Sequence, residues 1–404
     1  MTSRERVLAT LNFRTPDRLP KDLGGMRSTG ISAFAYPKLV QALGLPPRRP
    51  KLYDTSQMLA MPELDVLDAL GCDVVTVDMA PSTNALDEPA AWRPYDFNGR
   101  LPALMHRPED FRVESDGTIL QGEGPWLSRM PADAFVFDTE HAGEPLNLEG
   151  EIARPDLGKL KAELAKGMIT DAQVQATATY LRRIRAATGR AIFFNGIGAT
   201  LGFPGGMAAY SMLCLTEPEL VHELHDLRMA AAVENLRRLL PAIAESVDVV
   251  MLAADDHGIQ TSTILPPAVF RELYVPYYRR ANAAVHECAP GVKSFLHCCG
   301  AVYDILDDII AAGFDVLNPV QWSAGGHSWR EWKDKCRGRI ALWGGGVNTQ
   351  TTLPHGTPAE VAREAREVAA YLAGDNGYVF CAIHNLLAEV PPEKILALYG
   401  AAAL

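Results

Sequence analysis

The stretch KSFLHCCGAVYDILDDIIAAGFDVLNPVQ, Lys293–Gln321, decides the fold of this chain. It begins with a short apolar run, continues through an amphipathic stretch, and ends with a second short apolar run. Gly313 lies between the last two, where a helix C-terminus favours glycine. The order strand, helix, strand, with short connections, predicts one βαβ unit of a parallel sheet.

The same alternation extends along the chain. Helices are expected at Glu217–Leu240, Pro267–Cys288, Val302–Ala312 and Pro358–Ala373, and the strands that they separate at Lys21–Gly25, Asp73–Met79, Ala191–Gly196, Asp248–Ala254, Lys293–Cys299, Asp315–Val320, Ile340–Gly345 and Tyr378–Ile383. Eight such units predict an α/β fold, a (β/α)8 TIM barrel formed by residues 1–404 as a single domain. An insertion after the second strand, residues 81–190, is expected to contain a β-hairpin turning at Asp116-Gly117.

Composition narrows the classes of partner. The chain has 404 residues, of which 48% are hydrophobic and 22% charged, with a net charge of −11 and no basic run. This balance disfavours nucleic acid and anionic membranes and favours small molecules. No apolar run approaches the roughly 20 residues of a membrane span, and the N-terminal stretch lacks the apolar core of a signal peptide, so we expect a cytoplasmic protein. Seven scattered cysteines, an odd number, indicate reduced thiols rather than a disulfide framework.

Polar residues follow the expected strands at nearly every end. In a barrel of this kind the active site lies at the carboxyl ends of the strands, so these residues should converge. We expect substrate-binding roles for Arg27, Asp78, Asn195, Gln321 and Asn348.

The fourth strand ends in Asp255-Asp256. Neighbouring residues of a strand face opposite sides, so at most one of the two carboxylates enters the mouth of the barrel. We favour Asp256, together with Gln260, as catalytic residues. The alternative is that these carboxylates only cap the loop that follows.

The fifth strand ends in His297-Cys298-Cys299-Gly300. His297 and Cys299 are two residues apart and can therefore point at one centre. Imidazole nitrogen and thiolate sulfur are zinc ligands, and a catalytic zinc site needs about three protein ligands with one open position. A buried cysteine can equally serve as a small apolar side chain, so the pair alone leaves the structural alternative open.

Several motifs resemble the uroporphyrinogen decarboxylase superfamily over nearly the whole chain. They are RERVLATLNFRTPDRLP, IGATLGFPGG, AADDHGIQTSTILPPAVFRELYVPYYRR, SFLHCCG, AGFDVLNPVQ, WGGGVNTQTTLPHGTPAEV and AIHNLLAEVPPEKILALY. Within it, HCCG is most similar to the His-x-Cys-Gly of the zinc-dependent methylcobamide:coenzyme M methyltransferases. The resemblance implies a (β/α)8 barrel, zinc that activates a thiol substrate, methylcobalamin carried by a separate corrinoid protein, and a homodimer.

The resemblance also implies a set of metal ligands. His297 and Cys299 match the family pair directly. His384 stands where the zinc branch has a cysteine and serves as third ligand or as a catalytic residue, and Gln321 stands where that branch has an acidic ligand. Cys381 is a reserve ligand only.

Two hypotheses remain open. In one, the protein is a zinc-dependent methyltransferase. In the other, it is a metal-free decarboxylating or ligand-binding barrel that uses His297 and His384 as proton donors or acceptors. Porphyrinogen decarboxylases bind their many carboxylates through an arginine-rich N-terminal loop, and this chain offers the single Arg27 there.

Overall fold

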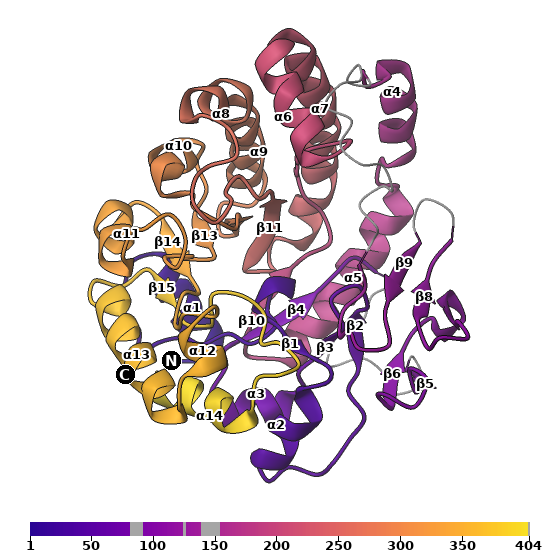
Figure 1. The fold of residues 1–404 in the computed structure, drawn as a ribbon. Coiled ribbons are helices and arrows are strands. Elements are labelled where there is room, and N and C mark those ends of the chain that lie inside the picture. The colour runs from indigo at the N-terminus through magenta and orange to yellow at the C-terminus, as the bar shows by residue number, and fades with distance from the viewer. Residues whose placement is uncertain (81–91, 124–126, 139–153, 403–404) are drawn as a thin grey trace.

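Seven parallel strands form the centre of the computed structural model, which describes residues 1–80, 92–123, 127–138 and 154–402. Their spatial order follows the chain, as in a barrel whose βα units come one after another (Figure 1). The strands are β4 (Val74–Val77), β10 (Ala191–Phe194), β11 (Val249–Ala254), β12 (Lys293–His297), β13 (Val316–Asn318), β14 (Ala341–Trp343) and β15 (Tyr378–Val379).

The segment around Lys21 closes the ring between β15 and β4. Lys21 forms a parallel bridge with Phe380, and its carbonyl accepts the Asp73 N–H at 2.8 Å. The predicted (β/α)8 barrel is confirmed, but the predicted first strand, Lys21–Gly25, is too long. The chain turns after Asp22, because the carboxylate of Asp22 accepts the Gly25 N–H at 2.7 Å and Gly24 takes a φ of +78°.

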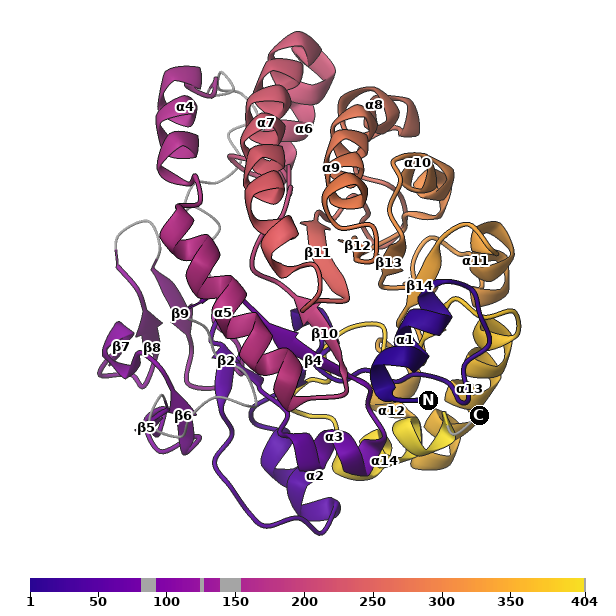
Figure 2. The same ribbon diagram turned by 180° about the vertical axis from the view of Figure 1, so that it is seen from behind.

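Most of the helices surround this sheet on its outer side, whereas the first helix of the chain packs against one end of the barrel (Figures 1 and 2). Those that follow the chain from the amino end are α1 (Ser3–Leu11), α2 (Tyr36–Ala42), α3 (Leu64–Leu70), α4 (Leu157–Lys166), α5 (Asp171–Ala187), α6 (Met207–Thr216) and α7 (Pro218–Ile243). The carboxyl half contributes α8 (Pro267–Leu273), α9 (Val275–Cys288), α10 (Leu306–Ala311), α11 (Trp329–Cys336), α12 (Thr352–His355), α13 (Pro358–Ala373) and α14 (Pro392–Ala401). The helix expected at Pro267–Cys288 is two helices, because Pro276 lacks the N–H that a continuous helix would need.

Small antiparallel sheets flank the barrel. One joins β1 (Ile31–Ser32), β3 (Leu59–Ala60) and β2 (Leu52–Asp54). The described part of the predicted insertion holds β5 (Arg93–Tyr95) with β6 (Ala103–Met105), and β7 (Phe111–Val113) with β8 (Ile119–Gln121) and β9 (Ser128–Met130). The predicted hairpin at Asp116-Gly117 is confirmed, since β7 pairs with β8 across it and Gly117 takes a φ of +86°. Other parts of the insertion lie outside the described residues.

The barrel interior is packed at one end and polar at the other. Alternate residues of the strands, such as Phe193, Phe295 and Trp343, form one buried cluster, and the rings of Phe193 and Phe295 meet edge to face at 4.8 Å. Val7 and Leu11 of α1 complete this cluster. α1 thus covers the end at which the strands begin, and the polar end of the interior lies at their carboxyl ends.

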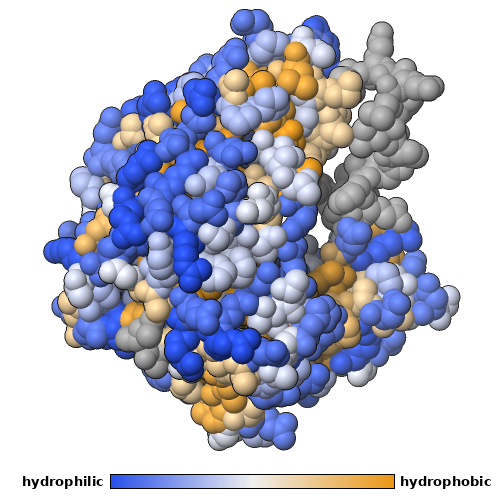
Figure 3. All heavy atoms as spheres, turned by 60° about the vertical axis from the view of Figure 1, so that its left-hand side comes forward, coloured by the Kyte–Doolittle hydropathy of each residue, from blue (hydrophilic) through white to orange (hydrophobic). Residues whose placement is uncertain are grey.

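The outer surface is mostly polar. The face in Figure 3 is largely hydrophilic, with scattered hydrophobic patches. Among the described helices, none is long and apolar enough to cross a membrane.

Candidate functional site

A cavity of about 630 Å³ opens at the carboxyl ends of the strands. Asn195, Ala254 and His297 lie at the ends of β10, β11 and β12, and the loops after them supply most of the remaining wall. The described residues that line the cavity are Met26, Arg27, Ser28, Gln57, Asn195, Gly196, Ile197, Gly198, Thr200, Met251, Ala254, Asp256, His297 and His384. Its size and mixed polar and apolar wall are typical of small-molecule sites.

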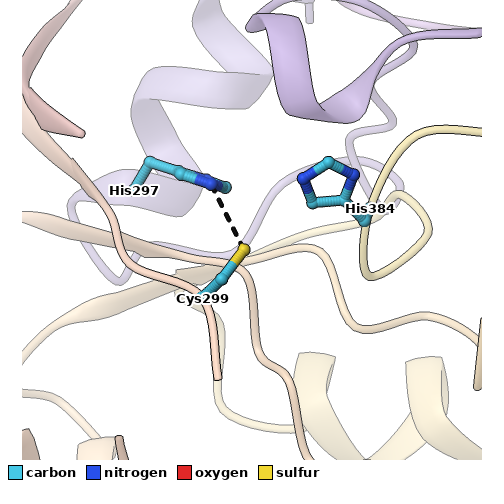
Figure 4. Close-up of side chains that lie close together, drawn as sticks. All are labelled: His297, Cys299 and His384. Atoms are coloured by element: carbon cyan, nitrogen blue, oxygen red, sulfur yellow. Dashed lines mark hydrogen bonds between the residues drawn. The ribbon is translucent and has the colours of Figure 1, made fainter. Parts of the chain in front are cut away.

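A group of three possible metal ligands lies at this cavity. His297 ends β12, Cys299 follows two residues later, and His384 comes from the loop after β15 (Figure 4). One ligand atom from each residue lies within 4.8 Å of the other two, and His297 Nε2 is 3.3 Å from Cys299 Sγ. One ion can therefore contact all three, and the nitrogen and sulfur donors suit a transition metal rather than magnesium or calcium.

Asn318 orients the first of these ligands. Its Nδ2 donates to the carbonyl of Trp343 at 2.9 Å, so its Oδ1 faces His297 Nδ1 at 2.7 Å. An amide oxygen only accepts, so Nδ1 of His297 carries the proton, and the Nε2 of a neutral ring presents its lone pair to Cys299 and His384. Buried partners of this kind fix the tautomer of histidines that bind metals.

Asp256 holds the loop that carries Cys299. Asp256 Oδ1 accepts the Cys299 N–H at 2.7 Å and lies 3.8 Å from His297 Nε2. Burial, and then the nearby Asp256 carboxylate, raise the pKa of the Cys299 thiol. Without a metal Cys299 is therefore a neutral thiol at pH 7, and a bound cation would have to displace its proton.

Asp255 faces away from the cavity, as the alternation of strand residues requires. Its Oδ2 accepts a hydrogen bond from Tyr278 Oη at 2.5 Å and from the Leu201 N–H at 3.0 Å. Burial raises the pKa of Asp255 to about 6. Asp255 thus attaches the loop after β10 to α9, whereas Asp256 faces the ligands.

Glycine is required after Cys299. Gly300 takes a φ of +90°, and a Cβ added there would lie 2.3 Å from the backbone of Gly258. The two loops therefore touch through their backbones, and the Ala301 N–H donates to the Ile259 carbonyl at 2.8 Å. This contact fixes the direction in which Cys299 leaves the strand.

His384 reaches the cavity because the chain has already left the sheet. Asn385 anchors this loop, accepting the Gly30 N–H at 2.8 Å and donating to Gln57 Oε1 at 2.8 Å. Burial, and then the neighbouring His297, lower the pKa of His384 to about 4, so its imidazole is neutral at pH 7. Cys381 instead belongs to the apolar cluster inside the barrel and is not in the group of ligands.

Arg27 also lines the cavity, beside two carboxylates. Its guanidinium is 3.5 Å from Asp78 and 3.8 Å from Asp54. Burial raises the pKa of Asp78, and Arg27 opposes that shift. Asn195 also lines the cavity, and its Nδ2 donates to Thr76 Oγ1 at 2.7 Å.

Asp78 and Cys299 lie beside lining residues rather than among them, and three more residues expected at the site also lie outside the described lining. Gln260 binds the carbonyl of Ser323 and the side chain of Gln350, which joins the loops after β11, β13 and β14. Gln321 Oε1 accepts the Gly300 N–H at 2.8 Å, and Asn348 caps the turn before α12. All three support the loops that hold the cavity residues.

Sequence reasoning did not single out Ser28, Gln57 or Asn318. Ser28 Oγ lies 3.4 Å from His297 Nε2, and Gln57 lines the cavity. The register of β12 and β13 pairs Asn318 with His297, so an inward position at the end of the sixth strand could have indicated it. No pattern indicated Gln57, because it lies between two short strands far from the barrel units.

Comparison with known proteins places this fold in a known family. The family model described as Uroporphyrinogen decarboxylase (URO-D) matches residues 199–403, about half of the chain. The chain belongs to the uroporphyrinogen decarboxylase family. The resemblance seen in the sequence motifs is thereby confirmed.

Two relatives show how far the likeness extends. A curated protein named uroporphyrinogen decarboxylase, from Syntrophotalea carbinolica, is 27% identical over 173 residues, which are 41% of this chain and 48% of that protein. The chain thus matches about half the length of this curated relative. A solved structure of a methyltransferase from Methanosarcina mazei is 17% identical, with a TM-score of 0.54 over 100% of this chain and 98% of that one. At this identity it shows a common fold.

The part matched by the uroporphyrinogen decarboxylase family model contains the whole ligand group. His297, Cys299 and His384 all lie within residues 199–403, whereas Arg27 and Asp78 lie before them. The wall that carries Arg27 is therefore the part of the cavity about which the family match says least.

Proposed function

We propose that this member of the uroporphyrinogen decarboxylase family is a zinc-dependent methyltransferase. It would transfer a methyl group from a corrinoid, carried by a separate protein, to a small-molecule thiol. The observation that carries the proposal is the convergence of His297, Cys299 and His384 within 4.8 Å at the edge of a 630 Å³ cavity. Three protein ligands beside open space are the arrangement of catalytic rather than structural zinc sites.

The residues suit zinc in their donor atoms, their orientation and their protonation. Two imidazoles and one thiolate are ordinary zinc donors, and Asn318 already directs the free lone pair of His297 toward the others. His384 is neutral near pH 7, as a ligand must be. Zinc bound here would act as a Lewis acid that keeps a substrate thiol in its thiolate form near neutral pH.

The other residues have separate tasks in this reaction. The substrate thiol loses its proton, its sulfur forms a bond to the methyl carbon, and the electron pair of the broken cobalt–carbon bond stays with cobalt. Asp256 is the one carboxylate among the described lining residues, and we assign it the proton that the thiol releases. Asn195, Gln57 and Ser28 offer hydrogen bonds that orient the rest of the thiol.

The metal-free alternative requires a histidine that exchanges protons near neutrality. His384 does not suit that role, because burial lowers its pKa to about 4. Porphyrinogen decarboxylation would also need several cations to bind the substrate's carboxylates, and Arg27 is the one arginine in the described lining. We therefore place the methyltransferase first.

Metal content tests the proposal, and adjacent cysteines provide a matched pair of variants. Protein prepared without chelator or metal-binding tag should contain close to one zinc per chain by elemental analysis. Cys299→Ala should lose it, whereas Cys298→Ala should retain it, because Cys298 is buried on the other face and accepts the His257 N–H. Folded wild-type protein that stays free of zinc after reconstitution would overturn the proposal.

A further inference from the structure

The wall of the cavity around Arg27 is not a free cationic site. Both of its neighbouring carboxylates are shielded from water, since the side chains of Asp54 and Asp78 are 8% and 25% exposed. Asp54 Oδ1 also accepts the Gln57 N–H at 2.9 Å, which fixes this carboxylate next to the cavity wall. The single positive charge of Arg27 is therefore outweighed by the two negative charges of these neighbouring carboxylates.

No other described residue of the cavity lining carries a permanent positive charge. Among the fourteen described lining residues, Arg27 alone carries one, and Asp256 adds a third carboxylate. Residues 81–91, 124–126, 139–153 and 403–404, which the structure does not describe, contain no lysine or arginine. Every lysine and arginine of the chain is thus in the described part, and Arg27 is the one that reaches the cavity.

Zinc does not reverse this balance. One zinc ion held by the Cys299 thiolate and two neutral imidazoles adds a single net positive charge. Together with Arg27 that gives two positive charges against the three carboxylates of Asp54, Asp78 and Asp256. The proton that a bound thiol releases to Asp256 stays in the cavity, so formation of the thiolate leaves this balance unchanged.

We propose that the thiol bound in this cavity is uncharged or positively charged, and carries no carboxylate, sulfonate or phosphate. This inference rests on the proposed function and names the substrate class of that site. A cavity lined by one sign of charge concentrates ligands of the opposite sign and excludes those of the same sign. The hydrogen-bonding groups of Gln57, Asn195 and Ser28 then suit a hydroxyl, amide or ammonium group on the substrate.

Isothermal titration of the zinc-loaded protein with small thiols of different charge tests the inference without relying on turnover. The set is 2-aminoethanethiol, 2-mercaptoethanol and 2-mercaptoethanesulfonate, each paired with its hydroxyl counterpart, in which oxygen replaces sulfur. We expect the cationic and neutral thiols to bind more tightly than the sulfonate, by about threefold to tenfold per unit charge in a partly wet cavity. Each thiol should also bind more tightly than its hydroxyl counterpart.

A matched pair of variants assigns the effect to the wall. Asp78→Asn removes one of the carboxylates beside Arg27 and should improve binding of the sulfonate relative to the neutral thiol by about threefold to tenfold. Asp65→Asn removes a carboxylate that pairs with Arg48 at 2.6 Å, outside the cavity lining, and should leave that ratio unchanged.

The outcomes distinguish a failure of the proposed function from a failure of the charge inference. If no thiol binds better than its hydroxyl counterpart, the proposed function fails and the inference with it. If thiols bind better but the sulfonate binds most tightly to the wild-type protein, the proposed function stands and the charge inference is wrong. An unchanged ratio in Asp78→Asn would overturn the inference as well.

Discussion

Replacing Asn318 by leucine should weaken zinc binding although Asn318 is not a ligand. Leucine has nearly the shape of asparagine but no polar atoms, so Asn318→Leu preserves packing and removes two hydrogen bonds. The Nδ1–H of His297 and the carbonyl of Trp343 would each lose a buried partner, at 2.7 Å and 2.9 Å. The protein should fold, but His297 would no longer be held in one tautomer and one orientation.

The magnitude follows from these two contacts. An unsatisfied buried polar group costs about 1–3 kcal/mol, so the free energy of unfolding should fall by roughly 2–6 kcal/mol. Loss of a partner that orients a metal ligand typically weakens binding by about 10–100-fold. Urea unfolding of the metal-free protein measures the first effect, and zinc titration against a competing chelator measures the second.

Asn282→Leu is the matched control. Asn282 is also buried, and its Nδ2 donates to the carbonyls of Tyr278 and Ala312, both at 2.9 Å. This variant should lose stability to a similar extent and keep the zinc affinity of the wild type. The assignment of Asn318 as the residue that orients His297 would be refuted by wild-type zinc affinity in Asn318→Leu. It would also be refuted if both variants lost zinc affinity to the same extent.

Three further predictions use the same protein. His384→Cys should retain zinc and His384→Ala should lose more than about 100-fold in affinity, because a thiolate replaces an imidazole as ligand and a methyl group does not; equal affinity in wild type and both variants would remove His384 from the metal site. The free energy of unfolding should fall as pH drops below about 6.5, since unfolded histidines gain protons there whereas burial lowers the pKa of His225 to about 4 and of His257 to about 3. Asp255 opposes this fall between pH 6 and 4, because its raised pKa of about 6 lets the folded protein bind a proton before the unfolded chain does. Urea unfolding of Asp255→Asn should therefore show a steeper loss of stability over this range, by up to roughly 3 kcal/mol. Parallel plots of unfolding free energy against pH for wild type and variant would contradict this role of Asp255. Incubation with uroporphyrinogen should leave its acetate groups intact by chromatography, because Arg27 is already neighboured by two carboxylates; formation of coproporphyrinogen would reverse the ranking of the two functions.

The sequence was informative about the barrel because each unit carries local evidence. In Lys293–Gln321, a buried strand, a helix, a terminal glycine and a second strand follow one another, and parallel strands leave few ways to connect them. Exact ends were harder to predict. Asp22 ends the first strand with a side-chain hydrogen bond to Gly25, and such a contact depends on the folded turn rather than on periodicity.

The residues of the site also divide into those that a local sequence pattern predicted and those that it did not. His297 ends β12 and Cys299 follows two residues later, so a period of two residues was enough to predict their convergence. His384 could be aligned only through the family resemblance, because strand alternation from Cys381 would have placed it outside the barrel, and the chain leaves the sheet before it.

The roles of Asn318, Asp54 and Gln57 could not be predicted from the sequence for a different reason. Their effects depend on pairs of residues that are far apart in sequence, such as Arg27 with Asp54 and His297 with Asn318. From the sequence, Arg27 was one cation available to an acidic substrate. In the folded chain the carboxylates of Asp54 and Asp78 lie 3.8 Å and 3.5 Å from that cation, which is the basis on which we propose a substrate without negative charge. On the proposal made above, the charge of the substrate depends on this folded wall, and no single residue of the sequence displays it.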